Sequence, residues 1–170
     1  MTKHAMWTPD EAHCRKTRLF RWMAELGFND YDRFLARSNA DIEWFWGELE
    51  QKMDIQWRRP YETVITDADE IMHPDWFAGG RLNIVDSLLE RCAEDPESAG
   101  RTALVSQAED GSTISYTYAE LTQAVEHCAR ALQPLGVSKG DVVSLYLPMI
   151  PQAIISMLAT IRLGAIYAPA

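Results

Sequence analysis

The apolar positions near the start of the chain recur at the spacing of amphipathic helices. Thr8-Pro9-Asp10-Glu11 has the form of a capping box with proline at the first helical position. Apolar residues between positions 19 and 26 keep a helical period until Gly27, so this stretch predicts one helix. A short helix is expected around Tyr31 to Ala36, and Ser38 to Asp41 has the form of a further helix start. The apolar stripe of that last helix consists of Ile42, Phe45, Trp46, Leu49 and Met53.

The aromatic residues divide the chain into two differently built regions. All six tryptophans and all five phenylalanines precede Gly79, whereas tyrosine is the only aromatic residue type after Gly100. From Gln56 to Asp75 the helical period is lost, which predicts an irregular arm that wraps over a larger body. We therefore expect a Trp-rich helical N-terminal extension with a wrapping arm in residues 1–78. Residues 79–170 are expected to form the first part of an α/β domain.

The second region begins with a helix, a hairpin and another helix. Asn83 is a possible cap for a helix that runs through Cys92. Two strand-like runs, 102–107 and 113–116, flank a strong turn dipeptide and predict a hairpin. Thr117 to Glu120 repeats the capping-box form, and apolar residues then keep helical spacing up to Gly136.

The end of the chain predicts a parallel sheet that is not finished. Val142 to Leu147 is a short apolar run, a helical pattern follows up to Gly164, and Ala165 to Ala168 starts another strand. This order predicts a right-handed parallel crossover. Parallel strands are normally covered on both faces, so the fold class expected is α/β with an incomplete sheet. Ligands of open α/β sheets bind beyond the carboxyl ends of the strands, so we expect the reactive residues to lie after Ala170.

Charge and size exclude several classes of function. The chain has 170 residues, with 16 Lys and Arg against 25 Asp and Glu, and a formal net charge of -9. Such a surface repels phosphate backbones and anionic lipid heads, so neither a nucleic acid nor a membrane is expected as a partner. The apolar fraction of 47% is enough for a core and excludes a disordered segment.

The cysteines and the N-terminus favour a cytoplasmic protein. Cys14, Cys92 and Cys128 are scattered, and none lies in a Cys-x-x-Cys pair. The first residues lack the continuous apolar run of a signal peptide. Leu145 to Ala170 has Arg162 as its only charged residue, and about 20 such residues would span a bilayer. Three prolines interrupt this stretch, which favours a buried α/β element over a membrane anchor.

No catalytic, cofactor-binding or metal-ligating residue is predicted in the chain. It contains neither a G-x-x-x-x-G-K-[ST] loop nor a G-x-G-x-x-G fingerprint, and Gly79-Gly80 and Gly136 to Gly140 are the nearest anion-binding candidates. A plain turn is favoured for both. The histidines show no metal-ligand spacing: His4, His13, His73 and His127. None of the strand serines stands in a G-x-S-x-G elbow: Ser106, Ser115 and Ser144. For the Trp44-Phe45-Trp46 cluster, core packing is favoured over an exposed recognition surface.

Four motifs in order nevertheless resemble a known family. Trp76 to Asn83 resembles the W-F-x-G-G-x-L-N stretch of acetyl-CoA synthetase-like enzymes in the adenylate-forming superfamily. Tyr116 to Leu121 resembles the family's Y-T-Y-x-E-L, and Gly136 to Val143 its G-V-x-K-G-D-x-V. Leu147 to Ala153 is similar to x-P-M-I-P-E-A, with Gln152 where the family usually has Glu. The Trp-rich first region is similar to the helical N-terminal extension of acetyl- and acetoacetyl-CoA synthetases.

The resemblance implies a function that needs more sequence than this chain has. Enzymes of the family use ATP and Mg to activate a carboxylic acid to an acyl-adenylate, which is then transferred to CoA. Their Ser/Thr/Gly-rich ATP loop, CoA-contacting arginines and catalytic lysine all belong after the equivalent of Ala170. We therefore expect an N-terminal structural segment, truncated and inactive alone, whose partner is the remainder of the synthetase chain. The N-terminal extension favours short acids such as acetate, propionate or acetoacetate.

Two alternatives remain open at this point. The chain could be a free-standing, non-catalytic interaction module that pairs its sheet edge or its Trp-rich face with another protein. An unfinished sheet could also self-associate to cover its own edge. The acid substrate, the oligomeric state and the origin of the truncation cannot be derived from these residues.

Overall fold

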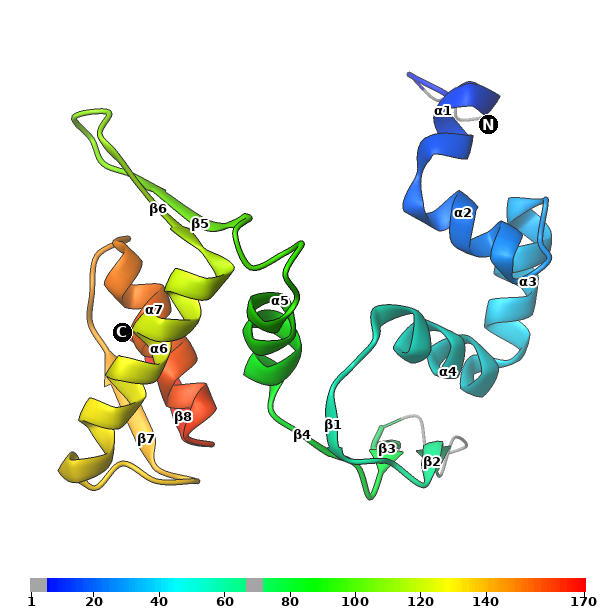
Figure 1. Cartoon of the computed structure of the whole chain (residues 1–170). Helices are drawn as coiled ribbons and strands as arrows, with labels where there is room; N and C mark the ends of the chain where they lie inside the picture. The colour runs from blue at the N-terminus through cyan, green and yellow to red at the C-terminus, as the bar shows by residue number, and fades with distance from the viewer. Residues whose placement is uncertain (1–5, 67–71) are drawn as a thin grey trace. The chain divides into compact units, whose positions relative to one another are not determined.

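The computed structural model describes residues 6–66 and 72–170, and it divides the chain into two compact units. The units are Met1–Lys52 and Met53–Ala170 (Figure 1). This division falls earlier than the change from aromatic to aliphatic sequence at residue 78. The reason is that the arm forms a strand, β1 (Trp57–Arg59), that pairs with β4 (Arg81–Leu82) inside the second unit. The grouping of residues 1–78 as one functional region stays a prediction.

The described residues of the first unit form four helices: α1 (Glu11–Lys16), α2 (Arg18–Glu25), α3 (Tyr31–Ala40) and α4 (Ile42–Met53). The prediction of one helix up to Gly27 is wrong, because Thr17 separates α1 from α2. Thr17 has an extended backbone, its N–H bonds to the Cys14 carbonyl, and its side chain accepts a hydrogen bond from the Phe20 N–H. The cap of α1 is Asp10, whose side chain accepts from the His13 N–H at 2.7 Å, rather than Thr8.

Aromatic rings form the core of the first unit. Trp22, Met23 and Phe34 are buried, and Trp44 and Phe45 pack against them. The Trp22 and Phe34 rings meet edge to face with 5.6 Å between centroids, a favoured geometry for such pairs. The predicted core role of Trp44 and Phe45 is thus confirmed. Trp46 remains 40% exposed at the rim of this core.

The arm is more regular than its sequence predicts. Besides the pairing of β1 with β4, β2 (Thr63–Thr66) pairs antiparallel with β3 (Asp75–Ala78). The expectation of an irregular arm over residues 56–75 is therefore wrong for its described residues. These strands are only two to four residues long, too short for a two-residue alternation to be recognised.

A π-helical turn joins the arm to the α/β part. The Asn83 cap is confirmed, since its Oδ1 accepts from the Val85 N–H at 3.1 Å. Its Nδ2 also donates to the carbonyls of Ile161 and Arg162, at 2.9 and 3.1 Å. The helix that follows has a π-helical stretch, η1 (Asp86–Glu90), before it continues as α5 (Arg91–Glu94). Asn83 therefore links two segments that lie almost eighty positions apart in the sequence.

The predicted hairpin and the predicted capping box are both present. Strands β5 (Thr102–Gln107) and β6 (Thr113–Thr117) pair antiparallel, and β6 leads directly into α6 (Tyr118–Leu132). Thr117 Oγ1 accepts from the Glu120 N–H at 3.2 Å, and the Glu120 carboxylate accepts from the Thr117 N–H at 2.8 Å. A short 3-10 turn, η2 (Gln133–Leu135), follows α6, and Gly136 ends it with a φ of 90°.

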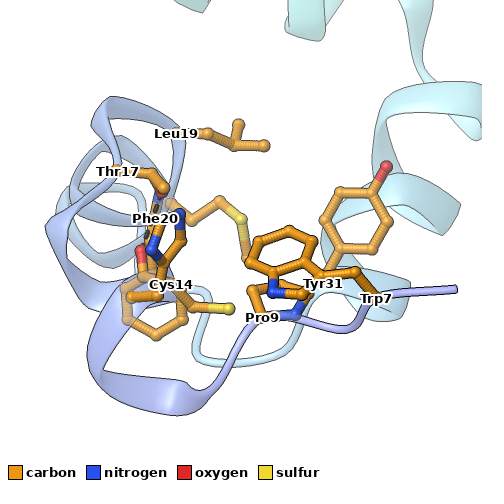
Figure 2. Close-up of a pocket in the computed structure, with 9 residues that line it drawn as sticks. Trp7, Pro9, Cys14, Thr17, Leu19, Phe20 and Tyr31 are labelled. Carbon is orange, nitrogen blue, oxygen red and sulfur yellow. Dashed lines mark hydrogen bonds between the residues drawn. The ribbon is translucent and has the colours of Figure 1, made fainter.

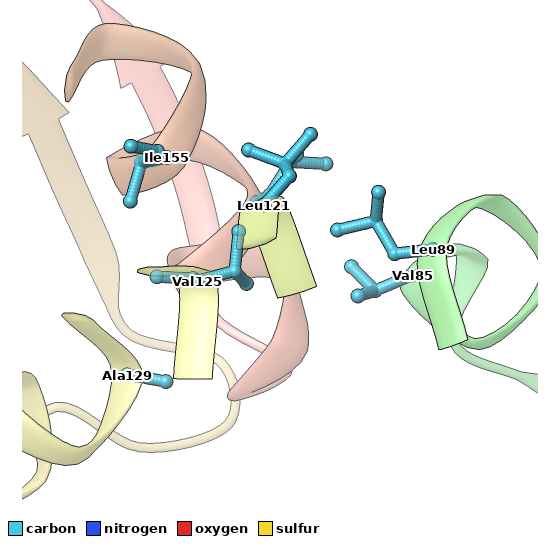
Figure 3. Packing of buried hydrophobic residues seen from close by; sticks show 8 residues of the cluster. Val85, Leu89, Leu121, Val125, Ala129 and Ile155 are labelled. Atoms are coloured by element: carbon cyan, nitrogen blue, oxygen red, sulfur yellow. The ribbon is translucent and has the colours of Figure 1, made fainter. Parts of the chain in front are cut away.

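The last three elements form the predicted parallel unit. Strand β7 (Val142–Leu145), helix α7 (Pro151–Arg162) and strand β8 (Ile166–Pro169) follow one another, and β7 pairs parallel with β8. Figure 3 shows side chains from the η1 region, α6 and α7 meeting in one core. None of the helices in the described residues has the length and apolar character that a membrane crossing requires. The buried core residues are Val85, Leu89, Leu121, Val125, Ala129, Ile155, Leu158 and Ala159.

The capping box makes a specific prediction about stability. Replacement of Thr117 by Ala removes the acceptor of the Glu120 N–H, so unfolding should become easier by about 1 kcal/mol. Thermal unfolding followed by circular dichroism measures the change. Thr122→Ala is the matched control, because Thr122 lies inside α6 and bonds back to the Tyr118 carbonyl, which is already the acceptor of a helical bond. Equal losses in the two variants would contradict a capping role.

Candidate functional site

The Gly79-Gly80 pair forms a tight turn between β3 and β4. The Gly80 N–H closes the turn on the Phe77 carbonyl at 3.0 Å, and the Gly79 carbonyl accepts from Arg59 Nε at 2.6 Å. Gly79 has a φ of 78°, and a Cβ on Gly80 would lie 2.5 Å from the Trp57 ring. Glycine is needed here for backbone shape and for close packing. The predicted turn is present, and the expectation that it binds no anion stays a prediction.

The loop from Gly136 to Asp141 binds its own carboxylate. Asp141 Oδ2 accepts from both the N–H and the hydroxyl of Ser138, each at 2.7 Å. These two bonds, the hydroxyl first, lower the pKa of Asp141 below its ordinary value. The Gly140 N–H donates to the Gly164 carbonyl at 3.1 Å. The donors an external anion would need are thus engaged within the protein, so this loop also acts as a turn.

The remaining polar candidates are not brought together. The described residues contain no group of three or more His, Cys, Asp or Glu side chains that could hold a metal ion. Ser106, Ser115 and Ser144 lie in three different strands. The three cysteines are free and half-buried. The expectation that the chain carries no catalytic residue stays a prediction.

One face of the β7–β8 pair leaves apolar side chains exposed in the second unit. Val142 and Ile166 stand opposite each other in the parallel register, and they are 65% and 56% exposed. Strand β8 has β7 as its partner and no described strand on its other edge. Parallel strands are stable when both faces are covered, whereas here α7 covers one face. Another layer of protein would normally lie on such a face.

The loop at the carboxyl end of β7 extends this apolar surface. Tyr146 and Met149 are each 88% exposed, and Ile150, which precedes α7, provides no side-chain cap for the helix. Pro151 occupies the first position of α7. Proline is tolerated there because a backbone N–H at this position would have no acceptor within the helix. Exposed apolar side chains of this size are typical of surfaces that other protein covers.

The first unit contains an apolar hollow of about 370 Å³ (Figure 2). Trp7, Phe20 and Tyr31 are among the aromatic residues that line it, and Cys14 and His13 add polar atoms at its wall. The Trp7 and His13 rings meet edge to face with 5.4 Å between centroids. The sequence offered no signal for this hollow, because its lining combines the segment before α1 with parts of α1, α2 and α3.

Neither glycine turn presents a built site for ATP or CoA, and the described residues gather no group of side chains for Mg. The N–H groups of Gly80, Ser138 and Gly140 bond within the protein, and no cluster of carboxylates is present in the described part of the chain to hold a cation. Nothing in the described geometry assembles a reacting centre, so no catalytic step is derived from these residues.

Family comparisons divide the chain into two consecutive matches. A family described as "Acetyl-coenzyme A synthetase N-terminus" matches residues 31–88, and one described as "AMP-binding enzyme" matches residues 89–170. The second match begins inside η1, and the first match covers α3, α4 and the arm, whereas α1 and α2 precede it.

Similar proteins agree with this division. An acetyl-coenzyme A synthetase of Laribacter hongkongensis is 37% identical over 149 residues, which are 87% of this chain and 22% of the relative. A mitochondrial acyl-CoA synthetase short-chain family member B of Dictyostelium discoideum is 43% identical over 124 residues, 72% of this chain and 18% of the relative. The solved acetoacetyl-CoA synthetase of Streptomyces lividans has a TM-score of 0.89 at 30% identity, over 96% of this chain and 26% of that one. The chain thus spans about a fifth to a quarter of the length of these proteins.

The Ser138–Asp141 turn makes a prediction that depends on pH. Ser138→Ala should move the pKa of Asp141 up toward its ordinary value, because the hydroxyl bond is the larger of its two causes. A lowered folded pKa stabilises the fold above the ordinary carboxyl pKa, and this stabilisation is lost as the pH falls through the folded value. NMR titration of the aspartate side chains measures the shift. Asp110, which bonds to Ser112 in the same way, serves as the control whose pKa should not change.

Proposed function

Because the chain belongs to the acetyl-CoA synthetase-like, AMP-binding enzymes, we propose that it is the N-terminal structural part of an acyl-CoA synthetase. Its role is to build the first layers of the nucleotide-binding domain. The helices of the first unit and the arm form the extension, and residues 79–170 supply the first strands and helices of that domain. The consecutive family matches and the high structural similarity over 96% of the chain support this role.

The whole enzyme is proposed to activate a short carboxylic acid. With ATP and Mg it forms an acyl-adenylate, and it then transfers the acyl group to CoA. The names of the similar proteins favour acetate or acetoacetate as the acid. The 170-residue chain alone is proposed to be inactive. Its three free cysteines are consistent with a cytoplasmic, reducing environment.

The uncovered β7–β8 face is the observation that carries this proposal. A parallel pair that exposes Val142 and Ile166 on one face does not complete a sheet. The occupant proposed for this face is the remainder of the synthetase chain, which would add strands beside the pair and a layer over it. The same surface would also drive self-association when that remainder is absent.

An ATP–pyrophosphate exchange assay tests the catalytic part of the proposal. We expect no exchange above background for the 170-residue chain with any acid of a short-chain panel. The chain joined to the residues that follow it in its gene should show exchange with at least one of these acids. A stop codon directly after codon 170 would contradict the proposal and favour the free-standing interaction module. Exchange by the 170-residue chain alone would also overturn it.

Sedimentation velocity tests whether the uncovered β7–β8 face drives self-association. The 170-residue chain should form dimers or larger species as its concentration rises through the micromolar range. Ile166→Lys should shift this equilibrium toward the monomer, because it places a charge in the contact. Val105→Lys is the matched control, since Val105 is 61% exposed in β5, away from this face. A monomer at all concentrations, or the same shift in both variants, would remove the β7–β8 face as the contact.

A further inference from the structure

A polar hollow of about 280 Å³ in the second unit is lined by three arginines. Arg58 comes from β1, Arg130 from the last turn of α6 and Arg162 from the last turn of α7. The hollow is several times larger than the ~30 Å³ that one water occupies in the liquid, so a polyatomic anion fits. In a chain with a net charge of -9, such a convergence of guanidinium groups is a local exception.

Two of these arginines are paired with carboxylates of η1. Arg58 donates through Nε and Nη2 to the two oxygens of Asp86, at 2.5 and 2.8 Å. Arg162 Nη1 donates to Glu90. Neither Asp86 nor Glu90 lines the hollow, whereas Glu126, the partner of Arg130, does. The carboxylates fix the planes of the guanidinium groups, which reduces the side-chain entropy that would be lost when an anion binds.

Many N–H donors remain available on these side chains. A guanidinium has five N–H groups, and the described contacts engage two of Arg58, one of Arg162 and one of Arg130, which bonds to Glu126. Gln133 adds a side-chain amide to the lining. The donors left over come from three different elements, and a tetrahedral anion can present a separate oxygen to each. A carboxylate has two oxygens and cannot.

The helix dipole gives a competing explanation for the positions of two of the arginines. Arg130 and Arg162 lie in the last turns of α6 and α7, where a cation complements the helix dipole. That explanation does not cover Arg58, which lies on a strand. The helix ends and the three carboxylates also weaken the attraction for an anion. Binding should therefore be in the millimolar range and should depend on salt.

We propose that this hollow is a binding site for a phosphate group, either as the free ion or as a monoester. The site lies apart from both glycine turns, and the proposal does not rest on the synthetase function. Arg58 lies on a strand, so the helix dipole does not explain its position. Its contribution to anion binding therefore distinguishes a binding site from two arginines that merely stabilise helix ends.

The test is an NMR titration of the 170-residue chain that follows the arginine Nε–H signals. Sodium phosphate, glycerol 2-phosphate and sodium acetate are added in separate series, with sodium chloride adjusted to keep the ionic strength constant. We expect saturable shifts of the Arg58, Arg130 and Arg162 signals with phosphate at millimolar concentrations, and no saturation with acetate. Equal or tighter binding of the monoester assigns the site to a phosphorylated metabolite, and weaker binding assigns it to the free ion.

Matched variants separate the site from general charge. Arg130→Gln removes one lining guanidinium that is 68% exposed and bonds to a glutamate four positions earlier, so the fold should tolerate it. Arg15→Gln removes the same kind of pair, Arg15 with Glu11, from the first unit. The phosphate dissociation constant should rise about tenfold in Arg130→Gln and not change in Arg15→Gln.

Arg58→Gln gives the decisive comparison. It should also weaken phosphate binding about tenfold, with circular dichroism to show that the helices persist. Shifts that grow linearly with phosphate, or equal dissociation constants in Arg58→Gln, Arg130→Gln and Arg15→Gln, would overturn the proposal. In that case the three arginines act in the fold alone.

Discussion

The packing of α6 against α7 is the contact on which the second unit depends. Leu121 and Val125 of α6 meet Ile155 and Leu158 of α7, and together they form the centre of the one large aliphatic core in the described residues. Each such side chain contributes about 1.5–3 kcal/mol when fully buried. Helix α7 must lie against α6 and the β7–β8 pair at the same time, so one face of that pair is filled. The other face has no comparable cover, and the proposed dependence on further protein follows from this asymmetry.

Local signals in the sequence account for the elements whose caps and turns lie within a few residues. Thr117 and Glu120 cap α6 as predicted because both partners of the box are three positions apart. The Asp110-Gly111 dipeptide likewise set the hairpin, with Gly111 at a φ of 82°. Thr17 shows the limit of such reasoning. A threonine inside an apolar period looks like a helical residue, yet its hydroxyl can cap a new helix, and the pattern alone does not distinguish the two roles.

Elements that depend on distant partners could not be predicted. The π-helical turn η1 places Asp86 beside Arg58 and Glu90 beside Arg162, which lie 28 and 72 positions away in the chain. The strands of the arm are stabilised by pairing with β4 and β3, and each is too short for a two-residue alternation to be recognised. The uncovered sheet face was predicted, because an apolar strand–helix–strand order already implies parallel strands with two faces to cover. The hollow lined by three arginines was not predicted, because the positions of these arginines in the sequence share no pattern.

The polar and apolar faces of the second unit lead to different consequences for a longer chain. The exposed Val142 and Ile166 would gain stability from any apolar layer, since burial of apolar area is favourable and not directional. Arg58 and Asp86 behave differently, because their double hydrogen bond is already made and raises the pKa of the arginine. Covering this pair with apolar protein would remove water from two charges and gain no new bond. Added protein should therefore cover the β7–β8 face, while the arginine hollow keeps access to solvent and to small anions.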